Sequence, residues 1–189
     1  MSQPNQFLIE GLDRLGKDML ILGIQHRLGY HQVLHYQKPV QLDFYAGGPS
    51  KSEALRRYQE ASFRTMFQFL CGTPSAKIIC NRAHLGETVY APMYRNYSGE
   101  YVFELEREFK IHQQLHVRLV LIVEDFSTSK HFVDDGQSLG GAEKRREEQD
   151  LFRNAFCTSE FQDKKLICVT DPKCGQFRDP NSILDEVLS

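Results

Sequence analysis

Residues 6–10 read QFLIE and lead directly into residues 11–18, which read GLDRLGKD. The first stretch is short and almost wholly apolar, which is typical of a parallel strand that is buried on both faces. The second stretch carries a glycine, four residues, a second glycine and a lysine, and a helical pattern begins at Lys17. Placed between a buried strand and a helix, this spacing is the pattern of a phosphate-binding loop. The stretch therefore predicts both the start of the fold and an anion site.

The residue types of the loop suit that role. Gly11 and Gly16 allow the backbone to curl so that successive N–H groups point inward and form a nest for anions. The helix that begins near Lys17 adds the positive end of its dipole, and the Lys17 ammonium neutralises phosphate charge. The alternative interpretation is a glycine turn that carries an exposed lysine.

One loop position departs from the usual pattern. The residue after the lysine is normally Ser or Thr, whose hydroxyl binds Mg²⁺, but here it is Asp18, followed by Met19. A carboxylate is a good oxygen ligand for Mg²⁺, although it repels phosphates where no metal lies between them. We expect Asp18 to bind Mg²⁺ directly or through water. The alternative is a degenerate loop that binds phosphate poorly or not at all.

Apolar runs and helical patterns alternate along the rest of the chain. The remaining strand-like runs are Gln32–Tyr36, Lys77–Asn81, Arg118–Glu124 and Lys165–Thr170. Helical patterns cover residues 17–28, 52–70, 84–94, 100–114, 141–156 and 181–188. This alternation predicts an α/β fold with a five-stranded parallel sheet between two layers of helices. We expect one domain over residues 1–189, with a mobile lid around residues 133–149, where a polar, Gly-rich stretch precedes a charged helix.

Composition narrows the class of protein. The chain has 189 residues, of which 41% are hydrophobic and 25% are charged, as in ordinary globular domains. A net charge of −2 argues against a strongly cationic nucleic-acid-binding protein and disfavours nucleic acid as a partner without excluding it. No apolar run approaches the roughly 20 residues of a membrane span, and the first residues lack the features of a secretory signal. We therefore expect a cytoplasmic protein with no membrane partner.

Cysteine and histidine spacing gives little sign of a metal centre. Five cysteines, an odd number without a CxxC pair, argue against a disulfide framework or a structural zinc site. The pair His31 and His35 and the pair His112 and His116 have the spacing of a helical metal pair. No neighbouring carboxylate or cysteine completes either pair, so no site is predicted there.

Two stretches resemble thymidylate kinases. Residues 7–14, FLIEGLDR, are similar to the start of those enzymes, and residues 81–90, NRAHLGETVY, are similar to a segment of thymidylate kinase-like proteins, especially those of bacteriophages. Weaker similarities follow in the same order at residues 35–39, 144–152 and 169–178. The chain thus resembles a thymidylate kinase-like P-loop deoxynucleoside monophosphate kinase over most of its length. The resemblance implies the three-layer fold of P-loop nucleoside monophosphate kinases.

The resemblance also implies an activity, which is ATP- and Mg²⁺-dependent phosphoryl transfer to a deoxynucleoside monophosphate, either dTMP or a related or modified pyrimidine nucleotide. The implied partners are ATP, a nucleoside monophosphate and a second copy of the chain, since similar kinases commonly form homodimers through helices beside the substrate site. Two alternatives stay open. One is a kinase that acts on a nucleoside or on a modified base in DNA, and the other is a nucleotide-binding homologue with impaired turnover.

Site residues follow from the resemblance position by position. Lys17, Arg14 and Arg82 would be catalytic, with Arg82 holding the phosphate of the acceptor. Asp13 would accept a hydrogen bond from the acceptor sugar, and Tyr90 would lie near its base. Independently of the resemblance, Phe67 is a candidate to stack on that base. The residues expected to bind ATP are Gly11, Asp13, Arg14, Leu15, Gly16, Lys17, Asp18 and Met19, Arg145 and Arg146 of the lid, and Asp171 near adenine.

The residues themselves allow other interpretations of four of these positions. Arg82 would also suit an ion pair with Glu87. The run KRREEQD at residues 144–150, which holds the lid arginines, is typical of a solvated helix face. Phe67 lies in an apolar stripe and would equally suit the core.

Asn81 is a second departure, because the resemblance implies Asp before the arginine. An amide keeps the hydrogen-bonding shape but loses the charge. The chain has thus gained a carboxylate at Asp18 and lost one at position 81. If both positions approach the same Mg²⁺, the total charge around the metal is conserved, and we advance this compensation as a hypothesis.

Overall fold

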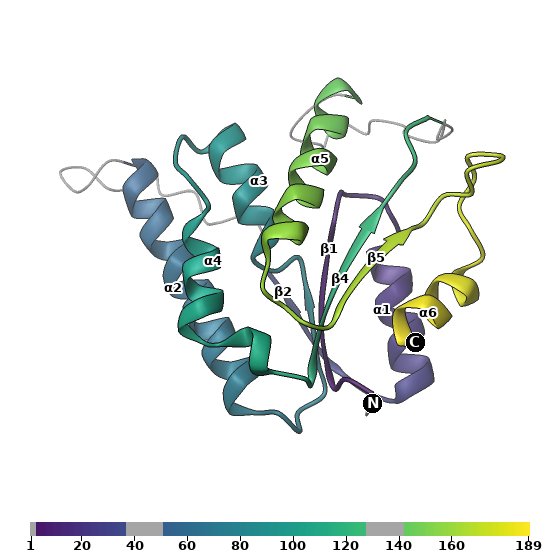
Figure 1. Cartoon of the computed structure of the whole chain (residues 1–189), viewed down its shortest axis with the longest axis horizontal. Helices are drawn as coiled ribbons and strands as arrows, with labels where there is room; N and C mark the ends of the chain where they lie inside the picture. Colours follow the sequence, from purple (N-terminus) through teal and green to yellow (C-terminus); the bar gives the residue numbers. More distant parts are fainter. Residues whose placement is uncertain (1–2, 37–50, 128–141) are drawn as a thin grey trace.

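The computed structural model describes residues 3–36, 51–127 and 142–189. The described residues contain one parallel sheet with the strand order β2-β3-β1-β4-β5 (Figure 1). The predicted five-stranded parallel sheet is therefore confirmed. The strands are β1 (Gln6–Gly11), β2 (Gln32–His35), β3 (Ile78–Asn81), β4 (Val117–Val123) and β5 (Lys164–Cys168).

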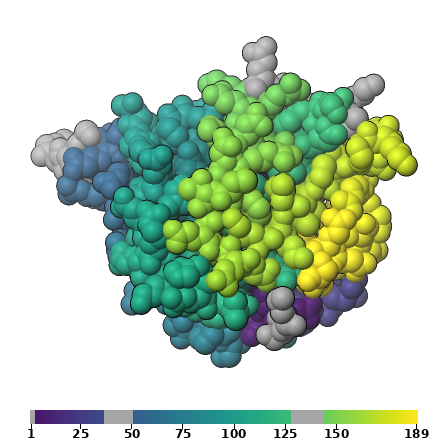
Figure 2. Space-filling model, in the orientation of Figure 1, coloured from purple at the N-terminus to yellow at the C-terminus, as the bar shows by residue number. Residues whose placement is uncertain are grey.

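Helices cover both faces of this sheet (Figure 1). Helices α1 and α6 pack together on one face, and α2, α3, α4 and α5 cover the other, so the fold has three layers. In the space-filling view, α5 and the residues before β5 occupy the middle of one side of the molecule, with α6 at its edge (Figure 2). The helices are α1 (Lys17–Leu28), α2 (Lys51–Gly72), α3 (Leu85–Tyr94), α4 (Tyr101–Glu108), α5 (Ala142–Thr158) and α6 (Pro180–Leu188), with a short 3-10 helix, η1 (Ile111–Gln113).

One helix prediction is wrong in its length. The pattern over residues 100–114 predicts a single helix, but α4 ends at Glu108 and η1 follows. Lys110 between them has a φ of 51°. This left-handed conformation cannot continue a right-handed helix, so the chain turns there.

The apolar runs occupy the positions that their composition predicts. Every residue of β1, β3 and β4 is buried, because these strands lie inside the sheet with helices on both faces. The edge strands β2 and β5 are partly exposed. Among the described helices, none has the length and hydrophobicity to cross a membrane.

Register places three strand ends level with one another. Ile9 of β1 and His35 of β2 both lie opposite Asn81 of β3. Ligands of open α/β sheets bind beyond the carboxyl ends of the strands. Gly11, His35 and Asn81 are thus brought to the edge of the sheet where a site is expected.

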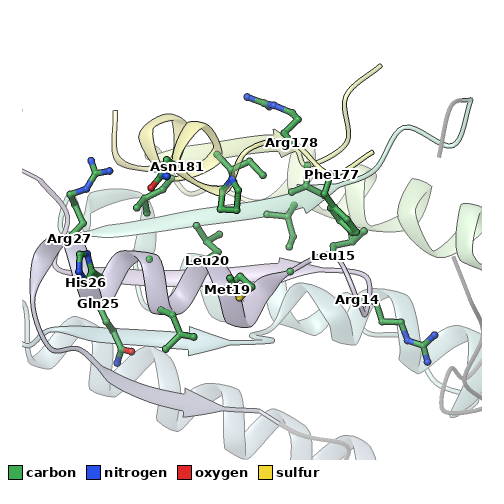
Figure 3. A pocket seen from close by; sticks show the side chains of 18 of the residues that line it. Arg14, Leu15, Met19, Leu20, Gln25, His26, Arg27, Phe177, Arg178 and Asn181 are labelled. Carbon is green, nitrogen blue, oxygen red and sulfur yellow. The ribbon is translucent and has the colours of Figure 1, made fainter. Parts of the chain in front are cut away.

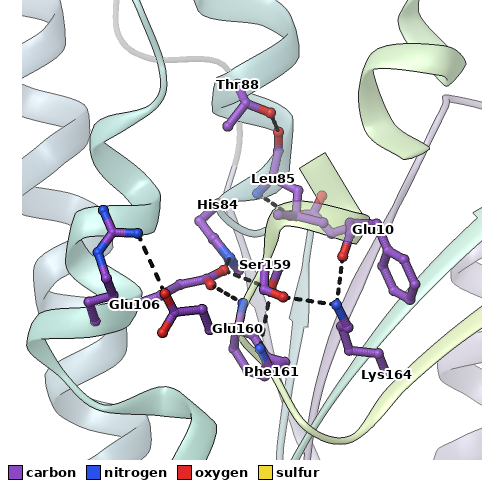
Figure 4. A network of polar contacts seen from close by, with 11 residues as sticks. Glu10, His84, Leu85, Thr88, Glu106, Ser159, Glu160, Phe161 and Lys164 are labelled. Carbon is purple, nitrogen blue, oxygen red and sulfur yellow. Dashed lines mark hydrogen bonds and ion pairs between the residues drawn. The ribbon is translucent and has the colours of Figure 1, made fainter. Parts of the chain in front are cut away.

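A buried polar network lies behind this edge (Figure 4). The imidazole Nε2 of His84 lies 2.6 Å from the Glu106 carboxylate, and both side chains are fully buried. The same carboxylate accepts hydrogen bonds from the Ser159 hydroxyl at 2.9 Å and from the Glu160 N–H at 2.7 Å. Burial alone would raise the pKa of Glu106, but the hydrogen bond and charge of His84 and the hydrogen bonds from the Glu160 N–H and Ser159 together lower it. The network ties the start of α3 to α4 and to the segment before β5.

A second buried carboxylate joins the network to the loop. Glu10, the residue before Gly11, accepts a hydrogen bond from the Leu85 N–H at 2.7 Å. Burial raises the pKa of Glu10, although the nearby positive groups act against this. The end of β1 is therefore fixed against the first turn of α3.

Candidate active site

The loop after β1 is curled as its glycines predict. Gly11 has a φ of 131° and Gly16 a φ of 85°, a region that glycine enters without steric cost. A Cβ on Gly11 would lie 2.3 Å from the Ile122 carbonyl oxygen, so no side chain fits there. Arg14 and Arg82 also have positive φ values, of 65° and 62°. Non-glycine residues hold such strained backbone mostly at functional sites, where the surrounding structure imposes it.

Lys17 is buried beneath this loop. Its ammonium donates to the Gly11 carbonyl at 2.8 Å and to the Leu12 carbonyl at 2.6 Å, and it lies 3.8 Å from the Asp13 carboxylate. Only 5% of the Lys17 side chain is exposed, so the interpretation as a turn with an exposed lysine is wrong. Burial lowers the pKa of Lys17 from 10.5 to about 8. A buried cation under a curled backbone is well placed to bind an anion.

The pKa of Lys17 predicts how anion binding depends on pH. Lys17 is charged at pH 7 and half neutral near pH 8, and only the charged form attracts phosphate. Tripolyphosphate also loses protons in this range, so the Lys17 effect is the ratio of the affinities of the unmodified protein and a Lys17→Met variant. We expect this ratio to fall above pH 8, approaching about tenfold per pH unit. Calorimetric titrations of both proteins between pH 6.5 and 9.5 measure it, and a ratio that does not change with pH would contradict the assignment.

Asp13 and Arg82 face each other across the site. An Arg82 Nη2–Asp13 Oδ1 distance of 2.7 Å joins the loop to the end of β3, and each side chain is about half exposed, 49% for Arg82 and 45% for Asp13. The alternative pairing of Arg82 with Glu87 is wrong. Glu87 is buried and accepts hydrogen bonds from Arg95 and Tyr97, both at 2.6 Å. Arg82 therefore presents its guanidinium to solvent beside the loop.

The two departures from the expected pattern meet in space. The Asn81 amide nitrogen donates to the Asp18 carboxylate at 3.1 Å and also lies 3.2 Å from Nδ1 of His35. Asn81 is buried, and its side-chain oxygen has no hydrogen-bond partner among the described residues. Sequence analysis did not connect His35 with this site, because no pattern along the chain links the end of β2 to the loop.

The aromatic residues predicted to lie near a base have different positions. Burial and the nearby carboxylates of Glu148 and Asp13 raise the pKa of Tyr90, and its ring packs edge-on against Phe152, with 5.8 Å between the ring centres. The expected contact of Phe67 with a base is corrected. Phe67 is fully buried in the core, with its ring centre 4.9 Å from that of His84, so its ring contacts no open surface.

Helix α5 begins in the predicted lid, whose residues 133–141 lie outside the described residues. Arg145 is buried, and its Nε donates to the Glu124 carboxylate at 2.6 Å, so the interpretation as a solvated face is wrong for this residue. Arg146 is exposed and lies over the ring of Phe126, 5.6 Å from its centre.

Glu148 is a site residue that sequence analysis missed. It accepts a hydrogen bond from the Tyr94 hydroxyl at 2.5 Å, and burial raises its pKa. The charges of Arg145 and Asp13 also act on the pKa of Glu148, which Arg145 lowers and Asp13 raises. The available signal was its spacing of three residues from Arg145, which puts both on one face of α5.

A cavity of about 1170 Å³ lies between α1 and α6 and opens at the loop (Figure 3). At the loop end it is lined by Arg14, Gly16 and Met19, and by Phe177 and Arg178 from the segment after β5. A largely apolar cavity with a few polar groups is the usual form of a small-molecule site.

Asp171, which was expected near adenine, is not among the residues that line this cavity. Its carboxylate accepts a hydrogen bond from the Lys173 N–H at 2.7 Å, within its own loop. The segment after β5 thus contributes Phe177 and Arg178 to the cavity, while Asp171 shapes the turn that leads to them.

No protein-family profile matches the chain, and no curated protein sequence does. Solved structures do match. The chain is similar to the YorR protein of Bacillus subtilis in complex with phosphorylated GDP, with 16% identity, a TM-score of 0.60 and coverage of 96% of this chain and 92% of that one. It is also similar to thymidylate kinase from Ehrlichia chaffeensis, with 16% identity, a TM-score of 0.56 and coverage of 96% and 95%. Thymidylate kinase from Candida albicans matches with 11% identity, a TM-score of 0.53 and coverage of 98% and 90%. At these identities the likeness concerns the fold, and the chain shares the three-layer α/β fold of these structures.

Proposed function

We propose that this chain transfers the terminal phosphoryl group of ATP to a deoxynucleoside monophosphate, either dTMP or a related or modified pyrimidine nucleotide. The observation that carries the proposal is the buried Lys17 under a curled anion loop, next to the Asp13–Arg82 pair. Phosphoryl transfer needs two phosphates held in line and positive charge where negative charge accumulates. Lys17, at the start of α1, and Arg82, just after β3, supply that charge.

The donor half of the site is the loop and the adjoining cavity. Backbone N–H groups of residues 11–17 and the Lys17 ammonium would hold the triphosphate, and Arg14 would reach the transferring group. The base would enter the cavity between Met19 and Phe177, which are both more than half exposed and able to pack on a flat ring. The lid arginines, Arg145 and Arg146, would approach the phosphates from α5.

The acceptor half is built on Arg82. Its planar guanidinium matches two oxygens of a phosphate, so an incoming monophosphate would take over the place now held by the Asp13 carboxylate. Asp13, once released, would accept a hydrogen bond from the sugar hydroxyl. Tyr90 would flank the base from α3.

The residues around Asp18 fit a magnesium ion. Hard divalent cations prefer oxygen ligands. Here the Asp18 carboxylate lies 3.1 Å from the amide nitrogen of Asn81, and the oxygen of that buried amide has no hydrogen-bond partner among the described residues. Asp18 and Asn81 would hold Mg²⁺ directly or through water. When bound, Mg²⁺ would neutralise part of the phosphate charge.

A panel of acceptors tests the proposal. The protein is incubated with ATP, Mg²⁺ and each nucleoside, ribonucleotide or deoxynucleotide in turn, and ADP is measured. Guanine nucleotides belong in the panel, because one of the similar structures contains phosphorylated GDP. ADP with one monophosphate supports the proposal. ADP only with a nucleoside or with DNA that contains a modified base points to the second activity, and ATP binding without turnover points to an impaired homologue.

Exchanging residues 18 and 81 tests the compensation hypothesis. Asp18→Ser removes the carboxylate beside Asn81, and Asn81→Asp sets two carboxylates at the contact that is now 3.1 Å. We expect each single change to lower Mg²⁺-dependent ADP formation by at least about tenfold. The double change keeps one carboxylate and should recover most of the activity. Losses that simply add in the double variant would contradict a shared ion.

A further inference from the structure

The cavity between α1 and α6 is larger than a nucleotide base needs. Its volume is about 1170 Å³, whereas sites that enclose a whole drug-sized ligand usually measure about 300–1,000 Å³. The base of the proposed donor would occupy only the end between Met19 and Phe177. Figure 3 shows that the cavity continues along α1 to Gln25, His26 and Arg27, away from the loop. This far end has no role in the proposed function.

The walls between the two ends are apolar. They come from α1 (Leu20, Leu22 and Gly23) and from α6 (Ile183 and Leu184). Of the five large apolar side chains that are more than half exposed in the described residues, four line this cavity. Exposed apolar side chains that cluster in this way mark binding sites. The four are Met19, Leu22, Tyr30 and Phe177.

The charged side chains along the cavity are all basic. Arg14 and Arg178 lie at the loop end, and His26 and Arg27 lie at the far end (Figure 3). None of the described residues that line the cavity is Asp or Glu, although the whole chain has a net charge of −2. The Arg27 guanidinium donates to the Asp185 carboxylate at 3.0 Å, but 45% of the Arg27 side chain stays exposed. The far end is therefore complementary to an anionic group.

These features select the chemistry of the occupant. An extended peptide or a second sugar carries polar groups along its length, and burying them against aliphatic walls without partners is costly. An acyl chain carries none. The part of α1 from Met19 to Arg27 rises about 12 Å at 1.5 Å per residue. With carbon–carbon bonds of about 1.5 Å, a zigzag chain of roughly ten carbons covers that length.

We propose that this cavity binds a medium-chain fatty acid, with its carboxylate at His26 and Arg27 and its chain along Leu22 toward Met19 and Phe177. The end of the chain would reach the space assigned to the donor base, so the fatty acid would compete with ATP. Only this competition rests on the proposed function. Binding of the fatty acid itself depends on the apolar walls and the basic far end alone.

Calorimetric titration of the nucleotide-free protein with decanoate tests the inference. We expect one site, and butyrate should bind at least about tenfold more weakly because it covers little apolar surface. Leu22→Glu places a carboxylate on the path of the chain and should weaken decanoate binding by about tenfold or more. Leu115→Glu is the matched control, because Leu115 is similarly exposed, 68% against 60% for Leu22, but does not line the cavity. Circular dichroism confirms that each variant is folded.

Arg27 and Asp185 provide a second test, in which two variants shift the affinity in opposite directions. Arg27→Ala should weaken decanoate binding by about two- to fivefold. Asp185→Asn should strengthen it by a similar factor, because it removes the carboxylate that now pairs with Arg27. Neither change should alter the affinity for octan-1-ol, an apolar chain without a charge.

Three results would overturn the inference. They are equal decanoate affinity in the unmodified protein and Leu22→Glu, equal losses in Leu22→Glu and Leu115→Glu, and shifts of the same sign in Arg27→Ala and Asp185→Asn. Simultaneous binding of decanoate and ATP would overturn the placement of the chain end. If the inference alone fails, the unmodified protein still forms ADP but shows no Leu22-dependent decanoate binding. If the proposed function alone fails, that binding persists without ADP formation.

Discussion

Lys17→Met is expected to reduce ADP formation by on the order of 10²–10³-fold or more, because it removes the positive charge beneath the phosphates. The folded protein should tolerate this change. Methionine has a similar length, and the Asp13 carboxylate that loses Lys17 is about half exposed and keeps its pairing with Arg82. The opposing effect is the loss of a donor for the Gly11 and Leu12 carbonyls. We therefore expect activity to collapse while the melting temperature changes by only a few degrees.

The control for this experiment is Lys77→Met. Lys77 is an exposed lysine whose ammonium donates to the Leu28 carbonyl at 2.7 Å, away from the loop. Its replacement should leave ADP formation unchanged. If Lys17→Met kept a tenth or more of the activity, or if it unfolded the protein, the assignment of Lys17 to the phosphates would fail. Steady-state ADP formation and thermal unfolding together separate these outcomes.

Glu106→Ala is expected to have the largest effect on stability. Glu106 is fully buried and accepts hydrogen bonds from His84, Ser159 and the Glu160 N–H. Its removal leaves these groups unpaired in the core, at a cost of roughly 3–5 kcal/mol. For a chain of this size, that corresponds to a fall in melting temperature of roughly 6–20 °C. Thermal unfolding followed by circular dichroism measures it.

At acidic pH, the difference in stability between the unmodified protein and Glu106→Ala should become smaller. The pKa of Glu106 is lowered from 4.5 by its partners in the folded protein, so its contribution to stability is present above pH 4.5 and is lost as the pH falls through the folded value. The control on the same helix is Glu108→Ala. Glu108 is exposed and pairs with Arg64, and such pairs are worth about 0.2–1 kcal/mol. Similar losses in both variants would contradict the role of the buried network.

Local patterns made the sheet and the loop predictable. A glycine–lysine spacing between an apolar run and a helical pattern needs only neighbouring residues to be recognised. The order of the edge strands and the packing partners of the helices depend on contacts between distant parts of the chain. For this reason periodicity places Phe67 in an apolar stripe but does not say that His84 covers its ring.

The parts of the site that sequence analysis missed all depend on such distant contacts. Asn81 lies 63 residues from Asp18 and 46 from His35 along the chain. The charged run around Arg145 also gives no sign that this residue is buried, because its partner Glu124 directly follows β4, 21 residues earlier. Alternating charge can be recognised from neighbouring residues, but the burial of one charged residue depends on contacts with distant parts of the chain.

The left-handed backbone of Arg14 and Arg82 has a consequence for protein engineering. Such a conformation costs a side-chain-bearing residue about 1–3 kcal/mol, and glycine would relieve it. A screen for thermal stability alone would therefore favour glycine at these two positions. The selected variants would be more stable but would lack the guanidinium groups that we propose to bind phosphate. Selection for catalytic turnover, in contrast, should retain both arginines at the cost of a lower thermal stability.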